Sequence, residues 1–99
     1  MIEVSQNKDE LIFKFLEQMG SKNSLEAEKL INDKLKIDNS PTKIIFDLKE
    51  VDYIASAFLR ICIITAKKAG NEKFSIVNIQ PQVRKIFSIS GLEDFFDIS

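Results

Sequence analysis

The hydroxyl group of Ser56 is the first candidate for chemistry in this sequence, because it lies where a long apolar helix is predicted to begin. The stretch Val51–Lys68 indicates a loop that leaves a strand and enters that helix. Backbone N–H groups in the first turn of a helix have no intrahelical partner and can hold a phosphate. A serine there can instead cap the helix, a role worth about 1 kcal/mol. The residues around Ser56 leave both roles open.

Other residue types argue against an independent active site. Asp47, Glu50 and Asp52 form an acidic approach to Ser56, which could suggest a metal site or a catalytic carboxylate pair, but the same pattern is typical of an exposed exit from a strand. The chain has no His, and its one Cys, Cys62, cannot build a cysteine metal cluster. We therefore expect no enzyme activity, no metal and no cofactor, and a buried Cys62.

Composition limits the class of protein further. A net charge of -1 gives no broad reason to expect nucleic acid, and the basic residues Lys67, Lys68, Arg84 and Lys85 are interpreted as scattered surface charges. The most apolar stretch is interrupted by Arg60, so it is no membrane span, and the N-terminal residues lack a signal peptide pattern. We expect a cytoplasmic protein without membrane insertion.

The first part of the chain predicts two strands and a helix. Met1–Ser5 and Leu11–Leu16 are predicted to form a hairpin, although periodicity alone would also allow a short buried helix for the second segment. After a turn at 20–23, Asn23 or Ser24 can cap a helix that ends near residue 36, with a capping box closed by Glu26. The apolar face predicted for that helix consists of Ala27, Leu30, Ile31 and Leu35.

The second part predicts a strand, a helix and a parallel strand. The run 43–48 has the nearly continuous apolar character of a central strand that is covered on both faces, and the residues 38–41 before it break the chain. The helix from Ser56 to about Lys68 leads to a second apolar run at 74–79, which completes a βαβ unit. A third helix is predicted from Pro81 to a stop at Gly91. After it, Phe95, Phe96 and Ile98 are expected to cover the remaining sheet surface as a short terminal segment.

The helix that begins at Ser56 has two apolar stripes. If Ser56 caps it, one face is formed by Leu59, Cys62, Ile63 and Ala66, and this face is predicted to pack on the sheet. The opposite stripe consists of Phe58, Ile61, Thr65 and Lys68. It carries more apolar surface than a solvated face needs, so it is predicted either to bind a partner or to be covered by the 49–55 loop or a neighbouring helix.

The segment from Lys43 to Ile98 resembles the STAS domain family, which includes bacterial anti-sigma factor antagonists. The matching parts are FDLKEVDYI, the helix start at Ser56–Leu59, AKKAGNEKFSIVNI, and the pattern P-x-V-x-x-x-F-x-x-x-G-L-x-x-x-F over Pro81–Phe96. They occur in order and at the correct spacing. The resemblance implies an α/β fold of STAS type, with a mixed sheet of four to five strands flanked by helices in a single domain over residues 1–99.

The family's regulatory serine corresponds to Ser56 in this sequence. The common family pattern there is Asp-Ser-Ser/Thr-Gly-Leu, whereas this chain reads Ala-Ser-Ala-Phe-Leu over residues 55–59. The resemblance implies that Ser56 is phosphorylated and that the residues around it bind a partner. The partner surface expected from it comprises Asp52, Ala55, Ala57, Phe58, Arg60, Ile61 and Thr65.

The resemblance also implies a mechanism and partners. The unmodified domain would bind an anti-sigma factor of the GHKL serine-kinase type, which then releases its sigma factor. The kinase would phosphorylate Ser56 and lose affinity, and a PP2C-type phosphatase would reset the switch. Two alternatives stay open: Ala55 and Phe58 are compatible with a non-phosphorylated accessory subunit that docks on a transporter ATPase, and a helix-terminal anion site would suit a small ligand.

Overall fold

The computed structural model describes residues 2–7, 9–37 and 43–99, and it has one mixed sheet with helices on one side. The strands are β1 (Ile2–Asn7), β2 (Glu10–Phe15), β3 (Lys43–Asp47), β4 (Phe74–Val77) and β5 (Asp97–Ile98). The helices are α1 (Ser21–Ile37), α2 (Ser56–Ala69) and α3 (Pro81–Ile89), with a 3-10 turn at Asn71–Lys73. The predicted break at 38–41 lies outside the described residues. The α/β class and the mixed sheet are confirmed.

The five strands lie in the order in which they occur in the sequence. β1 pairs with β2 as an antiparallel hairpin, and β2, β3, β4 and β5 are mutually parallel. β3 is therefore central, as predicted, and the unit β3–α2–β4 is the expected parallel crossover. The hairpin prediction is confirmed, since the segment 10–15 is a strand whose side chains are alternately buried and half-buried.

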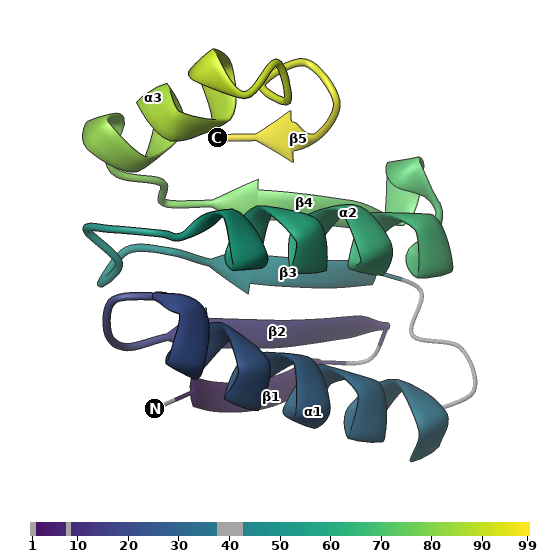
Figure 1. Ribbon diagram of the computed structural model, residues 1–99. Helices are drawn as coiled ribbons and strands as arrows, with labels where there is room; N and C mark the ends of the chain where they lie inside the picture. The colour runs from purple at the N-terminus through teal and green to yellow at the C-terminus, as the bar shows by residue number, and fades with distance from the viewer. Residues whose placement is uncertain (1, 8, 38–42) are drawn as a thin grey trace.

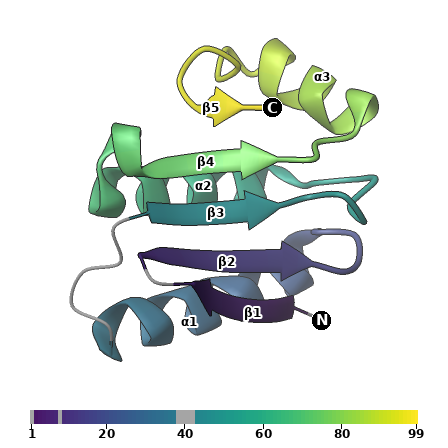
Figure 2. The same ribbon diagram turned by 180° about the vertical axis from the view of Figure 1, so that it is seen from behind.

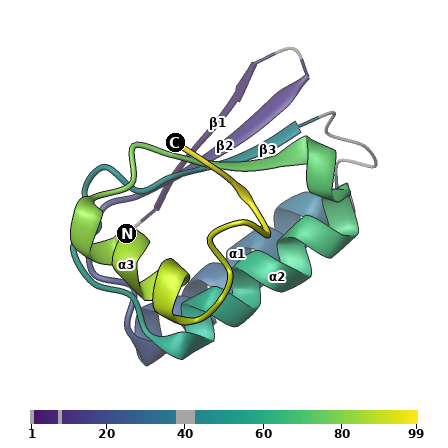
Figure 3. The ribbon, with the colours of Figure 1, turned by 90° about the horizontal axis from the view of Figure 1, so that it is seen from above.

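The core lies between the sheet and the helices. Figures 1 and 3 show α1 and α2 side by side on one face of the sheet, and Figure 2 shows the strands in front of both helices when the molecule is turned round. Phenylalanine rings fill this layer in a chain of edge contacts: Phe13 and Phe15 meet Phe46, and Phe46 meets Phe74. Each alternate residue of a strand points into this layer, because side chains of a strand have a period of two.

One face of the sheet is not covered by helices, which corrects the prediction for β3. The segment 43–48 was expected to be covered on both faces, but Ile45 is only half-buried, whereas its neighbours Ile44 and Phe46 are buried. A near-continuous apolar run cannot distinguish a strand buried on both faces from one with a half-buried aliphatic residue on its open face. The prediction of two covered faces was therefore wrong for the chain as described.

The start of α1 also differs from its prediction. The helix begins at Ser21, so Asn23 and Ser24 lie within its first turn and neither is the cap residue. The side-chain amide of Asn23 donates to the carbonyl of Gln18 at 2.6 Å, and the buried hydroxyl of Ser24 donates to the carbonyl of Met19 at 3.3 Å. These bonds tie the helix back to the preceding segment, which explains why polar residues are tolerated there.

The third helix ends as the sequence predicts. Gly91 has φ of +75°, a conformation that favours glycine, and the N–H of Leu92 donates to the carbonyl of Phe87 at 2.8 Å. This return of the chain brings Phe96 onto the core, where its ring lies 5.9 Å from that of Phe87. Phe95, which was expected to cover the sheet as well, remains 41% exposed.

Candidate functional site

The loop between β3 and α2 is held against the segment that precedes α1. The N–H of Met19 donates to the carbonyl of Tyr53 at 3.0 Å, and the N–H of Ala55 donates to the carbonyl of Met19 at 2.9 Å. Val51 and Ile54 anchor the same loop from below, since both side chains are buried. The residue that follows, Ser56, is therefore fixed at the carboxyl end of the parallel strands, where open α/β sheets often carry their sites.

Asp47 stabilises the other end of this loop. Its Oδ1 accepts hydrogen bonds from the N–H of Lys49 at 3.0 Å and from the side-chain amide of Asn78 at 3.2 Å, while the side-chain amide of Gln80 donates to the carbonyl of Lys49 at 2.7 Å. This carboxylate shapes the turn after β3. Within the described residues there is no group of three or more His, Cys, Asp or Glu side chains that could hold a metal ion.

Ser56 is the first residue of α2, and Ala55 is its cap residue. Ala55 has φ of −94° and ψ of 166°, and its carbonyl accepts from the N–H of Phe58 at 2.9 Å. No side chain caps the helix. The interpretation of Ser56 as a capping serine was therefore wrong by one position, and its exposed side chain does not serve to close the helix end.

Three residues expected to form the partner surface lie inside the protein. Phe58 is fully buried, Ile61 is 4% exposed and Thr65 is 2% exposed. The ring of Phe58 contacts the ring of Phe15 at 5.2 Å. The hydroxyl of Thr65 donates to the carbonyl of Ile61 at 2.7 Å, which satisfies it in the interior. These three side chains therefore do not lie on the exposed surface that was expected for a partner. Their part of the stripe is covered, as the alternative expected, but Phe58 is covered by Phe15 and Phe46 of the sheet, and Lys68 of the same stripe is exposed.

The core-facing side of α2 is therefore rotated relative to its prediction. Leu59, Cys62 and Ala66 are buried as expected, but Ile63 is only half-buried. Phe58, which was predicted to lie on the opposite side of the helix, is fully buried in the core. α1 lies beside α2, and the ammonium group of Lys68 on α2 donates to the side-chain oxygen of Asn32 on α1 at 3.0 Å.

The surface that remains available contains four of the predicted partner residues. Asp52 and Arg60 are exposed, and Ala55 and Ala57 are half-buried beside Ser56. Sequence reasoning missed two apolar neighbours on this surface: Tyr53 is 48% exposed and Ile64 is 36% exposed. Ile64 follows Ser56 and Arg60 at spacings of four, so counting the helix face from an exposed Ser56 would have found it.

The electrostatics of α2 favour an anion near Ser56. The helix has no acidic residue, and its charged residues are Arg60, Lys67 and Lys68. The N-terminal end of a helix carries a partial positive charge from its aligned peptide dipoles. Arg60 lies one turn after Ser56, and residues four apart on a helix are neighbours. A negative charge on the Ser56 side chain would therefore be stabilised by its own helix.

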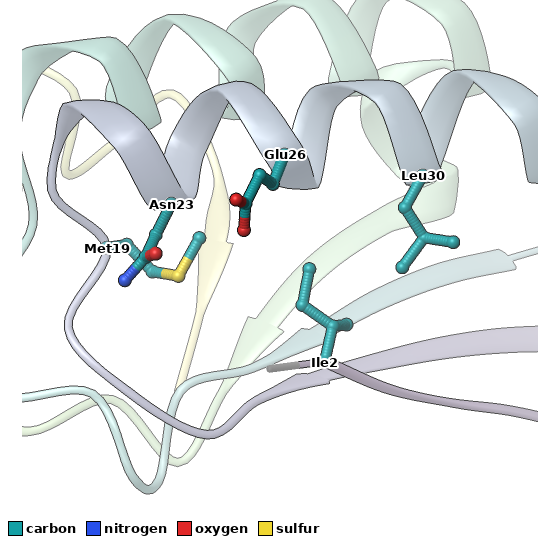
Figure 4. Close-up of a pocket in the computed structure, with 5 residues that line it drawn as sticks. All are labelled: Ile2, Met19, Asn23, Glu26 and Leu30. Atoms are coloured by element: carbon teal, nitrogen blue, oxygen red, sulfur yellow. The ribbon is translucent and has the colours of Figure 1, made fainter.

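The pocket shown in Figure 4 lies between β1 and α1, and Ser56 does not line it. It has a volume of about 180 Å³, and Ile2 and Leu30 point toward one another across it. Met19, Asn23 and Glu26 complete its lining. The pocket marks the place where α1 packs less tightly against the edge strand.

Cys62 is buried, as predicted, and is a free thiol. Burial raises the pKa of the Cys62 thiol, because the thiolate would lose its hydration. The side chain is therefore a small apolar core residue under neutral conditions. Among the described helices, none is both long and apolar enough to cross a membrane.

Comparison with known proteins identifies the family. The family model of the STAS domain matches residues 1–99. BtrV of Bordetella bronchiseptica, a protein assigned as an anti-sigma factor antagonist, is 32% identical over 83 residues, which cover 81% of this chain and 72% of that protein.

Solved structures agree with the fold. The crystal structure of a protein assigned as an anti-sigma factor antagonist from Thermotoga maritima matches with a TM-score of 0.87 at 20% identity, over 98% of this chain and 84% of that one. The anti-sigma factor antagonist SpoIIAA in its unphosphorylated form matches with a TM-score of 0.82 at 14% identity, over 100% of this chain and 88% of that one. At these identities the structures show the shared fold, while the family model covers the whole sequence. The chain therefore belongs to the STAS domain family, and it is similar to the anti-sigma factor antagonists within that family.

Proposed function

We propose that this protein is an anti-sigma factor antagonist that binds a GHKL-type serine kinase and is switched by phosphorylation of Ser56. The observation that carries the proposal is the exposed Ser56 side chain at the first position of α2, with no side chain capping the helix. Similarity to BtrV and SpoIIAA supports the class of partner. SpoIIAA also has a structure in its phosphorylated form, which matches this chain with a TM-score of 0.74 at 13% identity, over 100% of this chain and 91% of that one.

The protein acts in this proposal as a ligand and a substrate, and it performs no catalysis itself. The Oγ atom of Ser56 attacks the γ-phosphorus of ATP held by the kinase, the bond to ADP breaks, and the hydroxyl proton passes to a base of the kinase. The exposure of Ser56 supports this step, because the hydroxyl must enter the active site of another protein. A PP2C-type phosphatase hydrolyses the phosphate ester and restores the binding form.

The phosphate weakens binding because it changes the charge of the interface. Phosphorylation adds about 1.5 to 2 negative charges at neutral pH. The surface beside Ser56 carries the partly exposed apolar side chains of Tyr53 and Ile64 and the cation of Arg60. A partner that fits this surface presents apolar groups and a carboxylate. Bringing a dianion against such groups costs desolvation and repulsion, so the complex dissociates.

The accessory-subunit alternative rests on one remaining feature. Ala55 replaces the acidic residue of the family pattern, and an interface without phosphate chemistry would not need that carboxylate. Phe58, the other residue that favoured the alternative, is buried in the core and adds no bulk to the docking surface. We therefore keep the proposal of a phosphorylation switch that acts in transcription regulation in the cytoplasm. If a pull-down recovers a transporter ATPase subunit and no GHKL kinase, the accessory-subunit function replaces this proposal.

The test of the switch uses the cognate kinase, ATP and four proteins: wild type, Ser56→Ala, Ser56→Asp and a matched control, Ser88→Ala, which removes another exposed serine hydroxyl on α3. Mass spectrometry maps the modified residue, and calorimetry measures the affinity for the kinase. The proposal predicts modification at Ser56 only, weaker binding by Ser56→Asp, and wild-type behaviour of the control. Equal affinity of Ser56→Ala and Ser56→Asp, together with no modification at Ser56, would exclude the switch.

A further inference from the structure

The open face of the sheet has no covering element in the described part of the chain. In Figure 2, α1 and α2 lie behind the strands, and α3 lies beyond β5 at the edge of the sheet, so no helix of the described residues lies in front of the strands. The strands from β2 to β5 are parallel, and sheets of parallel strands are usually covered on both faces. Ile12 and Ile45 are direct neighbours in this face, and both are half-buried. The face therefore combines a parallel architecture with an apolar centre that faces solvent.

The charges on β2 and β3 form an ordered pattern around that centre. The open face of β2 carries Glu10, Ile12 and Lys14, and that of β3 carries Lys43, Ile45 and Asp47. The register aligns Glu10 with Lys43 and Lys14 with Asp47. The sequence of charges along one strand is thus the reverse of that along its neighbour.

These opposite charges lie side by side on β2 and β3 without a direct ion pair between them. In the part of the chain that the structure describes, neither Glu10 with Lys43 nor Lys14 with Asp47 forms an ion pair. All four residues are half-buried. The hydrogen bonds to Asp47 use its Oδ1 atom, which leaves Oδ2 as an acceptor. A shallow hollow that includes Lys14 and Asp47 is also lined by Glu3, Val4, Ser5 and Ile12.

We infer that two copies of this chain associate through their open sheet faces, with a two-fold axis that runs along the strands between β2 and β3. Rotation about this axis places β2 of the second copy over β3 of the first copy. Residues that are paired in the register, such as Lys14 and Asp47, stay at the same height along the strands. The rotation puts Lys14 opposite Asp47 of the second copy, Glu10 opposite Lys43 of the second copy, and Ile12 opposite Ile45 of the second copy. Every charge of the pattern then meets an opposite charge, as a two-fold interface requires of a self-complementary surface.

The geometry of stacked sheets allows this arrangement. Packed sheets lie about 10 Å apart, and their strand directions differ by about 30°. The charged residues lie close to the axis, where this rotation displaces them little, so long Lys and Glu side chains can still reach the opposite charges of the second copy. Five short strands spaced about 4.8 Å apart present roughly 400 Å² in plan, below the approximately 800 Å² per partner of a typical stable complex. The dimer is accordingly weak and depends on concentration.

Charge reversal tests the inference without any other protein. Glu10→Lys and Lys43→Glu each place two like-charged pairs across the two-fold axis. A mixture of these two variants restores both opposite pairs in the heterodimer, and so does the double variant Glu10→Lys/Lys43→Glu in its homodimer. Sedimentation velocity at protein concentrations from about 10 µM to about 1 mM follows the association.

We expect the wild-type chain to dimerise within this range, each single variant to raise Kd by at least about tenfold, and the mixture to restore a Kd near the wild-type value. Lys29→Glu, a reversal at an exposed position on α1, is the matched control and leaves Kd unchanged. Circular dichroism checks that each variant is folded. Rescue by the mixture cannot come from a change in folding of one chain, so it separates an interface from a structural effect.

Three results would overturn the inference: a wild-type chain that stays monomeric at the highest concentration, single variants with the Kd of the wild type, or a mixture without rescue. The open face lies opposite α1 and α2, so the result does not depend on the proposed role of Ser56.

Discussion

The ring of Phe58 on α2 packs edge-on against the ring of Phe15 on β2, with the centroids 5.2 Å apart and the planes at 85°. A second contact, with Phe46 at 6.0 Å, holds the ring between two strands. The family pattern has Gly at the position of Phe58. In this chain the larger residue fills the space between helix and sheet, so this difference from the family concerns the core and not the docking surface.

Removing the Phe58 ring should destabilise the fold strongly. A large-to-small change at a fully buried aromatic residue leaves a cavity, and Phe58→Ala is expected to lower the free energy of unfolding by about 3 to 5 kcal/mol. The control is Ile64→Ala on the exposed side of the same helix, which should cost less than about 1 kcal/mol. Urea denaturation measures both. Similar losses for the two variants would contradict the placement of Phe58 in the core.

The start of α2 should accept a better cap. Ala55 has the extended backbone conformation of a cap residue but no side-chain acceptor, so Ala55→Asp is expected to stabilise the protein by about 0.5 to 2 kcal/mol. Ser56→Ala should change stability by less than about 0.5 kcal/mol, because Ser56 is not the cap. Thermal or urea unfolding compares the two variants with the wild type. A loss of about 1 kcal/mol on Ser56→Ala would show that its hydroxyl caps the helix after all.

Cys62 should make the stability depend on alkaline pH. Burial raises the pKa of its thiol above the ordinary value of a cysteine, so at alkaline pH the folded state retains a proton that the unfolded state loses. The contribution is complete below the unfolded pKa and declines above it by about 1.4 kcal/mol per pH unit. The difference in unfolding free energy between wild type and Cys62→Ala should therefore narrow between about pH 9 and pH 11. A constant difference would show that the thiol ionises equally in both states.

Asn78 should be sensitive to substitution because it combines two roles. Its φ of +55° is rare for residues other than glycine, and its side-chain amide donates to Asp47 at 3.2 Å. Asn78→Ala loses the hydrogen bond and keeps the strain, so we expect a loss of about 1 to 2 kcal/mol. Asn78→Gly relieves the strain and should lose less. Equal stability of Asn78→Ala and wild type in urea denaturation would contradict both roles.

Much of the fold could be predicted from local sequence pattern. The two strands of the hairpin, the parallel strands around α2, and the punctuation of α3 by Pro81 and Gly91 follow from residue types that act over a few positions. The order of these elements also carried the family resemblance. Ser56 was placed correctly at the start of α2, although the cap of the helix is Ala55, because a helix boundary depends on the φ and ψ angles of one residue.

The amino-acid sequence by itself determined the kinds of elements, their order and the position of Ser56 at a helix start. Only the tertiary structure decided which side of α2 is buried, because the helix is apolar on most of its surface and periodicity alone offers two stripes. The side with Phe58 is buried because its ring packs against the rings of Phe15 and Phe46 on the sheet. The exposure of Tyr53 and the open face with Ile12 and Ile45 were likewise outcomes of packing, since burial depends on contacts between segments that are distant in the chain.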